Sequence, residues 1–230
     1  MFASEKCLVD AFEQRAGAFL KAVYGGPVSR IFSIREFDSQ HGVADIVLGT
    51  FKEDFSARWA RRPVNENWIA PLLRLRSGGV IRLDSFAEQF GVSRRTARQQ
   101  IGEYVAANFL VPVGENDFKM MRKYEPVVSG VVAIEAKLRD WKRALFQAMR
   151  YRRFSDFVFV LLDDDCVDTA EDNLEHFRSA NIGLASMDDM SEQIHLHFVP
   201  HRTANKQGYY YSRLNEMAYA SFVRPRAACY

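Results

Sequence analysis

Hydrophobic residues along this chain recur at two different spacings. Over the first segment they return every three or four positions, which predicts one helix between Ser4, its N-cap residue, and the glycine pair at 25–26. Two mostly apolar runs, 28–37 and 42–51, then predict strands joined by a short polar turn, which is the pattern of a β-hairpin. The N-terminal segment therefore combines a helix with a hairpin.

Strands and helices alternate again after residue 126. The run 131–137 predicts a strand, the segment from Leu138 to about Arg152 a helix, and the run 156–162 another strand. Beyond them we expect a further helix and two short strands, at 169–180, 183–187 and 194–199. This alternation predicts the α/β class, with helices packed on a sheet.

Residues 61–125 show a different order of elements. A helix is expected near 65–79, and a short helix begins at Asp84 or Ser85 and ends at Gly91. After a three-residue turn a second helix follows, and then a small β-hairpin. Helix, turn, helix and β-wing in this order are typical of a winged helix-turn-helix.

The pattern therefore predicts two domains. An α/β domain consists of residues 1–60 and 126–230, and a small winged-helix domain at 61–125 interrupts it. The net charge of +2 does not by itself indicate a polyanionic partner. Residues 61–125, however, hold 11 Lys and Arg against 7 Asp and Glu, so the positive charge is concentrated in the inserted domain.

Composition narrows the class of protein. With 48% hydrophobic and 26% charged residues, the chain has the composition of a soluble globular protein. Its three cysteines are widely spaced, which predicts neither a disulfide framework nor a zinc site and fits a reducing compartment. No secretory signal and no apolar run of transmembrane length are visible. We expect a cytoplasmic protein that does not associate with a membrane.

Charged residues interrupt two of the predicted strands. Side chains alternate between the faces of a strand, so Glu135 and Lys137 point the same way, and Asp45 interrupts the earlier run 42–51. If these strands are neighbours, the three side chains converge. Two carboxylates would then be able to hold a hard divalent cation, beside an ammonium that stabilises charge on a phosphate. A half-solvated strand carrying an ordinary ion pair is the alternative, and it stays open.

The segments "VAD" at 43–45 and "IEAK" at 134–137 resemble the metal-binding core of the PD-(D/E)XK nuclease superfamily. Ala44 stands where the proline of that name would be. The resemblance covers about residues 4–50 and 127–162. It implies a restriction-endonuclease-like mixed sheet flanked by helices, interrupted by the winged-helix domain between its second and third core strands.

The same resemblance implies roles for individual residues. Asp45 and Glu135 would bind Mg²⁺ or Mn²⁺, and Lys137 would assist the attacking water. Glu5, in the first helix, is similar to a glutamate that points back to the metal in this superfamily. Gln147, with Tyr151 after it, resembles the glutamine and tyrosine of archaeal Holliday-junction resolvases, which gives Gln147 a supporting catalytic role. The implied reaction is hydrolysis of a phosphodiester in DNA repair, restriction or defence.

A basic helix is predicted directly after these residues. Its polar stripe is expected to consist of Arg139, Arg143, Gln147 and Arg150. Its apolar face is expected to consist of Leu138, Trp141, Leu145 and Met149. Such a stripe is a solvated face in most proteins, but next to a site that attacks phosphodiesters it would neutralise a nucleic-acid backbone.

The second helix of the inserted domain presents the residue types that contact DNA bases. In a winged helix this helix enters the major groove, and arginine–guanine and glutamine–adenine pairs are the expected contacts. The candidate DNA-binding residues at its start are Ser93, Arg94, Arg95, Thr96, Arg98 and Gln99. Winged helices also serve as protein-binding or dimerising modules, and the acidic residues Glu115 and Asp117 depart from the usual basic wing.

Three histidines, at 195, 197 and 201, lack the companion residues of a metal site, so we expect ordinary surface histidines. No Ser-His-Asp constellation is apparent in the sequence.

Our leading hypothesis from the sequence is a metal-dependent DNA endonuclease, with Mg²⁺ or Mn²⁺ as cofactor and duplex DNA as partner. The competing hypothesis is a DNA-binding regulator whose nuclease-like body does no chemistry. A third is a nuclease subunit that acts only with a partner. A homodimer is also open, since one site cuts one strand.

Overall fold

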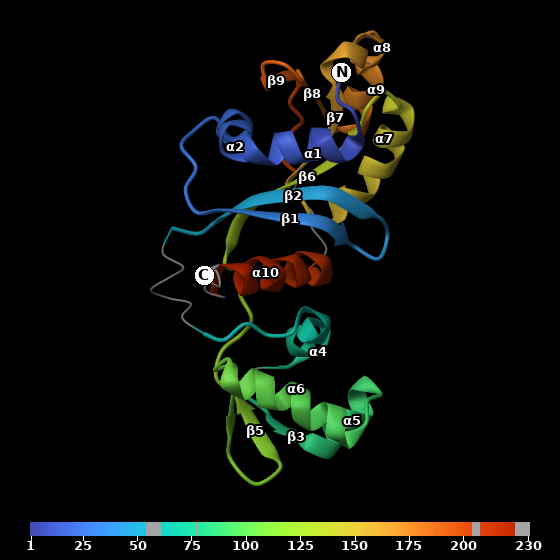
Figure 1. The fold of residues 1–230 in the computed structure, drawn as a ribbon. Helices are drawn as coiled ribbons and strands as arrows, with labels where there is room; N and C mark the ends of the chain where they lie inside the picture. The colour runs from blue at the N-terminus through green and yellow to red at the C-terminus, as the bar shows by residue number, and fades with distance from the viewer. Residues whose placement is uncertain (54–60, 77, 204–207, 224–230) are drawn as a thin grey trace. The chain divides into compact units, whose positions relative to one another are not determined.

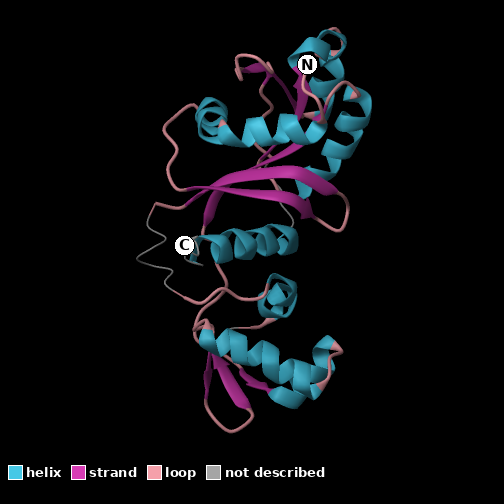
Figure 2. Ribbon diagram, in the orientation of Figure 1, coloured by secondary structure: helices cyan, strands magenta, loops and turns pink. Residues whose placement is uncertain are grey.

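Two compact units make up the structure, a computed structural model that describes residues 1–53, 61–76, 78–203 and 208–223 (Figure 1). The first unit consists of Met1–Glu53 and Val128–Tyr211. The second contains the described residues from 61 to 127 and from 212 to 223. The predicted α/β class is confirmed, because a six-stranded mixed sheet and a three-stranded sheet are flanked by helices (Figure 2).

The first unit is built on the six-stranded sheet, in the order β1-β2-β6-β7-β8-β9. These strands are β1 (Ile31–Asp38), β2 (Val43–Phe51), β6 (Val128–Lys137), β7 (Phe157–Asp163), β8 (Gly183–Met187) and β9 (Ile194–Phe198). The first two form the predicted antiparallel hairpin, and β6 runs antiparallel to β2. The next pairs, β6–β7 and β7–β8, are parallel, and β9 is antiparallel to β8. Two strands far apart in sequence, β2 and β6, are therefore neighbours inside the sheet.

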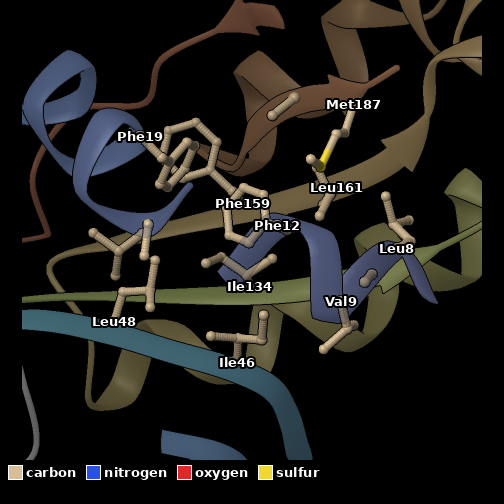
Figure 3. Packing of buried hydrophobic residues seen from close by; sticks show 14 of the residues in the cluster. Leu8, Val9, Phe12, Phe19, Ile46, Leu48, Ile134, Phe159, Leu161 and Met187 are labelled. Carbon is tan, nitrogen blue, oxygen red and sulfur yellow. The ribbon is translucent and has the colours of Figure 1, made fainter. Parts of the chain in front are cut away.

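One face of this sheet is covered by the N-terminal helices α1 (Glu5–Gln14) and α2 (Ala16–Tyr24). Their apolar residues pack against alternate residues of the strands in one core, part of which Figure 3 shows as Leu8, Val9, Phe12, Phe19, Ile46, Leu48, Ile134, Phe159, Leu161 and Met187. The single helix predicted here is wrong. Arg15, with φ −97° and ψ 6°, interrupts it and lets the Phe12 and Phe19 rings pack edge to face, 4.9 Å apart.

The predicted ends of this segment are correct. The side chain of Ser4 accepts a hydrogen bond from the Cys7 amide at the N-terminus of α1, and Gly25, with φ 69°, ends α2 in the left-handed conformation. Because every other residue of β6 faces the helices, Ile134 and Ala136 belong to this core, as predicted, and Glu135 faces away from it.

The basic segment that joins β6 to β7 consists of α7 (Trp141–Ala148) and the 3₁₀ helix η2 (Met149–Arg153). It starts later than predicted, because the Asp140 carboxylate caps α7 by accepting from the Arg143 amide. The apolar face was predicted correctly only in part, since Trp141 is buried but Met149 is 48% exposed. The buried line is instead Trp141, Ala144, Ala148 and Tyr151. The small alanines let the helix lie close to the sheet, whereas Phe146 and Met149 are exposed.

The predicted helix around 169–180 is divided. The segment between β7 and β8 contains a 3₁₀ turn η3 (Asp164–Cys166) and two short helices, α8 (Asp168–Glu171) and α9 (Leu174–Ala180).

The second unit has the helices and the hairpin in the order predicted for the inserted domain, with an additional strand, β3, before α5. Its elements are η1 (Glu66–Trp68), α4 (Ile69–Arg74), β3 (Val80–Arg82), α5 (Leu83–Phe90), α6 (Arg94–Ala106), β4 (Leu110–Pro112) and β5 (Asp117–Met120). The strands form a sheet in the order β3-β5-β4, and β4 and β5 are the predicted hairpin. Phe86, Ile101 and Tyr104 lie in the core between the helices and this sheet.

Two of the three predicted helix ends in this unit are correct. Gly91, with φ 62°, ends α5, and the Ser93 hydroxyl accepts from the Thr96 amide at the start of α6. The start of α5 was predicted wrongly at Asp84 or Ser85. The helix begins at Leu83, directly after β3, because the Leu83 amide bonds to the carbonyl of Asn116 in the wing turn.

The C-terminal helix α10 (Gly208–Val223) changes the predicted domain boundary. Residues 212–223 belong to the second unit, whereas the prediction placed 126–230 as a whole in the α/β domain. The physical reason is a buried ion pair: Glu216 accepts from Arg61 Nη1 at 2.9 Å, and both side chains are almost fully buried. Glu216 also accepts from the Val64 amide and from Tyr124, which ties this helix to the inserted segment.

Candidate functional site

Asp45, Glu135 and Lys137 converge on one face of the six-stranded sheet, as predicted. Antiparallel pairing of β2 with β6, in the register Ile46–Ile134, brings Asp45 next to Glu135. Lys137 Nζ lies 3.1 Å from Glu135 Oε1 and 3.9 Å from Asp45 Oδ2. Glu5, in the first turn of α1, also reaches this ammonium, at 3.2 Å. Three separate elements therefore supply the four charged side chains, which we call the Lys137 cluster.

Both carboxylates on the strands are held by further hydrogen bonds. Asp45 Oδ2 accepts from the backbone amide of Ala136 at 2.7 Å. Glu135 Oε2 is hydrogen-bonded to the hydroxyl of Tyr151, which also lies 2.6 Å from the Val43 carbonyl. A tyrosine hydroxyl carries one hydrogen, so it donates fully to one of these two acceptors. A protonated Glu135 would resolve the competition by donating to Tyr151.

Burial and an excess of negative charge dominate the electrostatics of the cluster. The Glu135 side chain is 2% exposed, and burial raises its pKa despite the Tyr151 hydrogen bond. Burial likewise raises the pKa of Asp45, although the Ala136 amide and Lys137 oppose the shift. Burial alone would lower the pKa of Lys137, but attraction to Glu135 and Asp45 outweighs it and raises that pKa. Three carboxyl groups share one ammonium, so the cluster favours an additional proton or cation.

The oxygen atoms around Lys137 Nζ are of the type that hard divalent cations prefer. Besides the three carboxylates, the Ala136 carbonyl oxygen lies 2.8 Å from this nitrogen. The donor set therefore fits Mg²⁺ or Mn²⁺ chemically. In the described part of the chain, no three His, Cys, Asp or Glu side chains are arranged as a metal-binding group. The lysine ammonium lies among the three carboxylates of the cluster.

Gln147 does not join the cluster. It lies half-buried on α7, and its Oε1 is a buried acceptor with no hydrogen-bond partner among the described residues. The residue that reaches Glu135 is Tyr151, four positions further on. The resemblance points to this tyrosine as well, but the site residues predicted from the sequence included only Gln147. Tyr151 is fully buried although it lies between basic residues of η2. A single aromatic residue in such a basic stretch is the sequence signal for a contact with the strand β6.

The predicted basic stripe is present only in part. Arg143 and Arg150 are exposed on α7 and η2, but Arg139 precedes the helix and its guanidinium contacts the sulfur of Met1 at 3.5 Å. Arg150 Nη1 donates to the His41 carbonyl at 3.3 Å, in the turn that leads into β2. The basic side chains that follow the cluster therefore lie against the β1–β2 hairpin as well as on the helix.

The candidate DNA-binding residues of the second unit lie at the start of α6. Ser93 is occupied as the N-cap and Thr96 is half-buried. Arg94 pairs with Asp84, at 2.9 Å, and Arg98 donates to Asn116 of the wing turn at 3.2 Å. Five of the six residues are exposed: Ser93, Arg94, Arg95, Arg98 and Gln99. Because the Ser93 hydroxyl caps the helix, the arginine and glutamine side chains are the ones that extend from this end of α6.

His197 is not the ordinary surface histidine that we expected. Its Nδ1 lies 2.5 Å from Glu171 Oε1 and its Nε2 lies 2.7 Å from the Ser186 hydroxyl, a Ser-His-Glu order that the sequence did not reveal. Ser186 is fully buried and donates to Asp164. Since no substrate can reach a hydroxyl with zero exposure, this chain of hydrogen bonds is a structural link between the ends of β8 and β9 and α8.

Comparisons of the chain with protein-family models, with curated proteins and with solved structures give no match. Within the described residues, every helix is too short or too polar to cross a membrane.

Proposed function

We propose that this protein is a metal-dependent DNA endonuclease of the PD-(D/E)XK type, acting in DNA repair, restriction or defence. The observation that carries the proposal is the Lys137 cluster. Carboxylates from α1, β2 and β6 lie within 4 Å of one lysine ammonium, and two of them stand on adjacent strands. An ordinary surface ion pair needs one acid for each base, so the excess of acids supports a site that takes up a cation.

The topology of the first unit supports the same proposal. In the first unit, two helices, an antiparallel hairpin, a third antiparallel strand, a helical segment and a parallel strand follow one another from α1 to β7. The second unit is inserted between β2 and β6, the second and third strands of this core. These features match what the resemblance implies for the fold.

The residues of the cluster suit phosphodiester hydrolysis. Asp45, Glu135 and Glu5 would hold Mg²⁺ or Mn²⁺, which supplies Lewis-acid stabilisation of charge on the phosphate. The ammonium of Lys137, kept protonated by its acidic neighbours, stabilises negative charge that develops on the same phosphate and orients the attacking water. Tyr151 and the Ala136 amide fix the two strand carboxylates in place.

Two basic surfaces support DNA as the substrate. Arg143 and Arg150 lie on the segment that supplies Tyr151, and α6 of the second unit exposes arginine and glutamine side chains suited to duplex DNA. Cutting both strands of a duplex would need two sites, which a homodimer or a partner subunit would provide.

The test is cleavage of plasmid and short duplex DNA with Mg²⁺, Mn²⁺ or a chelator. We expect cutting by the wild type that requires the metal and is lost in Glu135→Ala and Lys137→Ala, while binding of the same duplex persists. Lys6→Ala is the matched control, because Lys6 also belongs to an acidic–basic pair near the N-terminus but is 80% exposed. Loss of cutting in this control as well would show that the assay reports general damage to the protein.

A second function is favoured by a specific observation. The polar groups of the cluster are satisfied internally, since Lys137 pairs with the acids, Ala136 bonds to Asp45 and Tyr151 bonds to Glu135. A DNA-binding regulator with an inert nuclease-like body would need no metal and would retain this arrangement. Binding without cutting under any metal would support the regulator, or a nuclease subunit that requires a partner.

A further inference from the structure

The outer side of the basic segment exposes two large apolar side chains. Phe146 is 64% exposed and Met149 is 48% exposed, and residues three apart on a helix are neighbours. Six exposed basic residues surround them in sequence: Arg139, Lys142, Arg143, Arg150, Arg152 and Arg153. The one acid of this segment, Asp140, is occupied in capping α7. The surface thus combines an aromatic ring with concentrated positive charge.

The position of Phe146 is fixed by the packing beneath it. Trp141, Ala144 and Ala148 are buried, so the turn that carries Phe146 cannot rotate its ring into the core. The guanidinium of Arg150 lies over this ring, 5.3 Å from its centroid. Arg150 is in turn held by the His41 carbonyl. One face of the ring therefore has a cationic neighbour that is anchored on the β1–β2 hairpin.

Two contacts link this surface to the Lys137 cluster, one made by Arg150 and one by the residue after it. The next residue, Tyr151, bonds to Glu135, and the turn that accepts from Arg150 leads into the strand carrying Asp45. The segment that carries Phe146 therefore contacts both strands that carry the carboxylates. This continuity is the reason to ask what the ring binds.

The positive charge around Phe146 indicates which kind of molecule would bind there: a membrane, a protein or a nucleic acid. A membrane-binding helix needs a continuous apolar face, and here two residues stand among six cations. A protein partner of ordinary composition would leave most of those cations uncompensated when they are desolvated. A nucleic acid supplies phosphates for the cations and a flat apolar base for the ring, the combination found in proteins that bind single strands.

We propose that Phe146, with Met149 beside it, stacks on an unpaired nucleobase, so that the preferred substrate is DNA with single-stranded or melted bases next to the cut phosphate. The inference rests on the proposed function, because it names the substrate class of that site. Bases inside a continuous duplex are stacked on each other and offer no free face to the ring. Single-stranded or gapped DNA offers that face without the cost of unstacking.

The test compares Phe146→Ala, Phe146→Leu and Phe146→Trp with the wild type in full-length protein. The probes are a fluorescein-labelled duplex and the same duplex carrying a five-nucleotide bubble, both titrated in the presence of a chelator so that no cutting occurs. Stacking is worth about 1–3 kcal/mol per base, which corresponds to roughly 5- to 140-fold in affinity. We expect the alanine and leucine variants to lose this factor for the bubble relative to the duplex, and tryptophan to retain it.

A second readout reports the stacking itself. 2-Aminopurine placed in the bubble should lose fluorescence on binding to the wild type and to Phe146→Trp, and keep it with Phe146→Leu. Met190→Ala, which removes a 90% exposed hydrophobic residue between β8 and β9, is the matched control and should change nothing.

An equal loss of affinity for duplex and bubble, or no loss at all, would overturn the inference. Insertion into intact duplex gives the first result, and a protein or membrane partner gives the second. Because the titrations contain no metal, they are independent of cleavage. Preferential binding of the bubble without cutting would contradict the proposed nuclease and support the stacking. Cutting that is unchanged in the Phe146 variants would support the nuclease and contradict the stacking.

Discussion

Replacing Lys137 with methionine distinguishes a cation site from a self-contained ion-pair cluster. The Lys137 side chain is 13% exposed and lies 3.1 Å from Glu135, which is 2% exposed. Removing one partner of a buried pair costs about 3–5 kcal/mol, and the half-exposed Glu5 adds at most about 1 kcal/mol. For Lys137→Met we expect the free energy of unfolding to fall by about 3 kcal/mol. This is the low end of the range, because Glu135 keeps its hydrogen bond to Tyr151 and can take up a proton.

The assay is urea denaturation followed by circular dichroism, with and without Mg²⁺ or Mn²⁺. A cation at 100 times its dissociation constant adds about 2.7 kcal/mol, so it would restore most of the loss in Lys137→Met. The double variant with Glu135→Gln should lose this rescue, and Lys6→Met, whose pair with Asp10 is exposed, should show neither effect. A Lys137→Met protein that is destabilised and gains nothing from either cation would refute the cation site.

Two further variants test the surroundings of the site and the second unit. Tyr151→Phe removes the buried hydroxyl that bonds to Glu135 and lies against the Val43 carbonyl, so urea denaturation should show a loss of about 1–3 kcal/mol. Cleavage should fall roughly 10- to 100-fold, and unchanged cleavage would contradict the positioning role. Glu216→Ala leaves the guanidinium of Arg61, whose side chain is 1% exposed, without its partner, and urea denaturation should show a loss of about 3–5 kcal/mol. Glu175→Ala removes an exposed pair with Arg178 and should cost less than about 1 kcal/mol, and equal losses in the two variants would contradict this account.

Much of the fold follows from local patterns in the sequence. The hairpin of β1 and β2, the strand β6 and the two helices around Gly91 were predicted because alternation, caps and breakers act within a few residues. The break at Arg15 was missed because the apolar residues keep their helical spacing from α1 through to α2. Only packing of Phe12 against Phe19 distinguishes two helices from one.

The placement of the helix α10 could not be predicted from local sequence patterns. Its placement with the second unit depends on Arg61 and Glu216, which are separated by 155 residues. Arginine and glutamate are residue types that are mostly found on protein surfaces. Neither the spacing of neighbouring residues nor a turn signal in the sequence indicates that these two are buried. A buried pair of this kind becomes visible only when both chain segments are folded.

The candidate site was more predictable than the helix faces around it. Asp45, Glu135 and Lys137 could be grouped because side chains on a strand alternate strictly, so a single assumption of adjacency brings all three together. The orientation of α7 has no such constraint, since its sequence offers two overlapping apolar faces. The structure buries the face with small alanines, so that Tyr151 bonds to Glu135, Gln147 Oε1 has no hydrogen-bond partner among the described residues, and Phe146 is exposed.

The charges in β6 argue for a function because they oppose the stability of the fold. Val131, Val132, Ala133 and Ile134 are fully buried, and an apolar residue at Glu135 would continue that strand without the cost of desolvating a carboxylate. Replacing buried ion pairs with well-packed hydrophobic residues is neutral or stabilising in many proteins. The Lys137 cluster goes further, because its acids outnumber its base and burial raises the pKa of two of them. An ion pair that served only the fold would be balanced, whereas an acidic excess around a buried ammonium is suited to bind a cation and a phosphate.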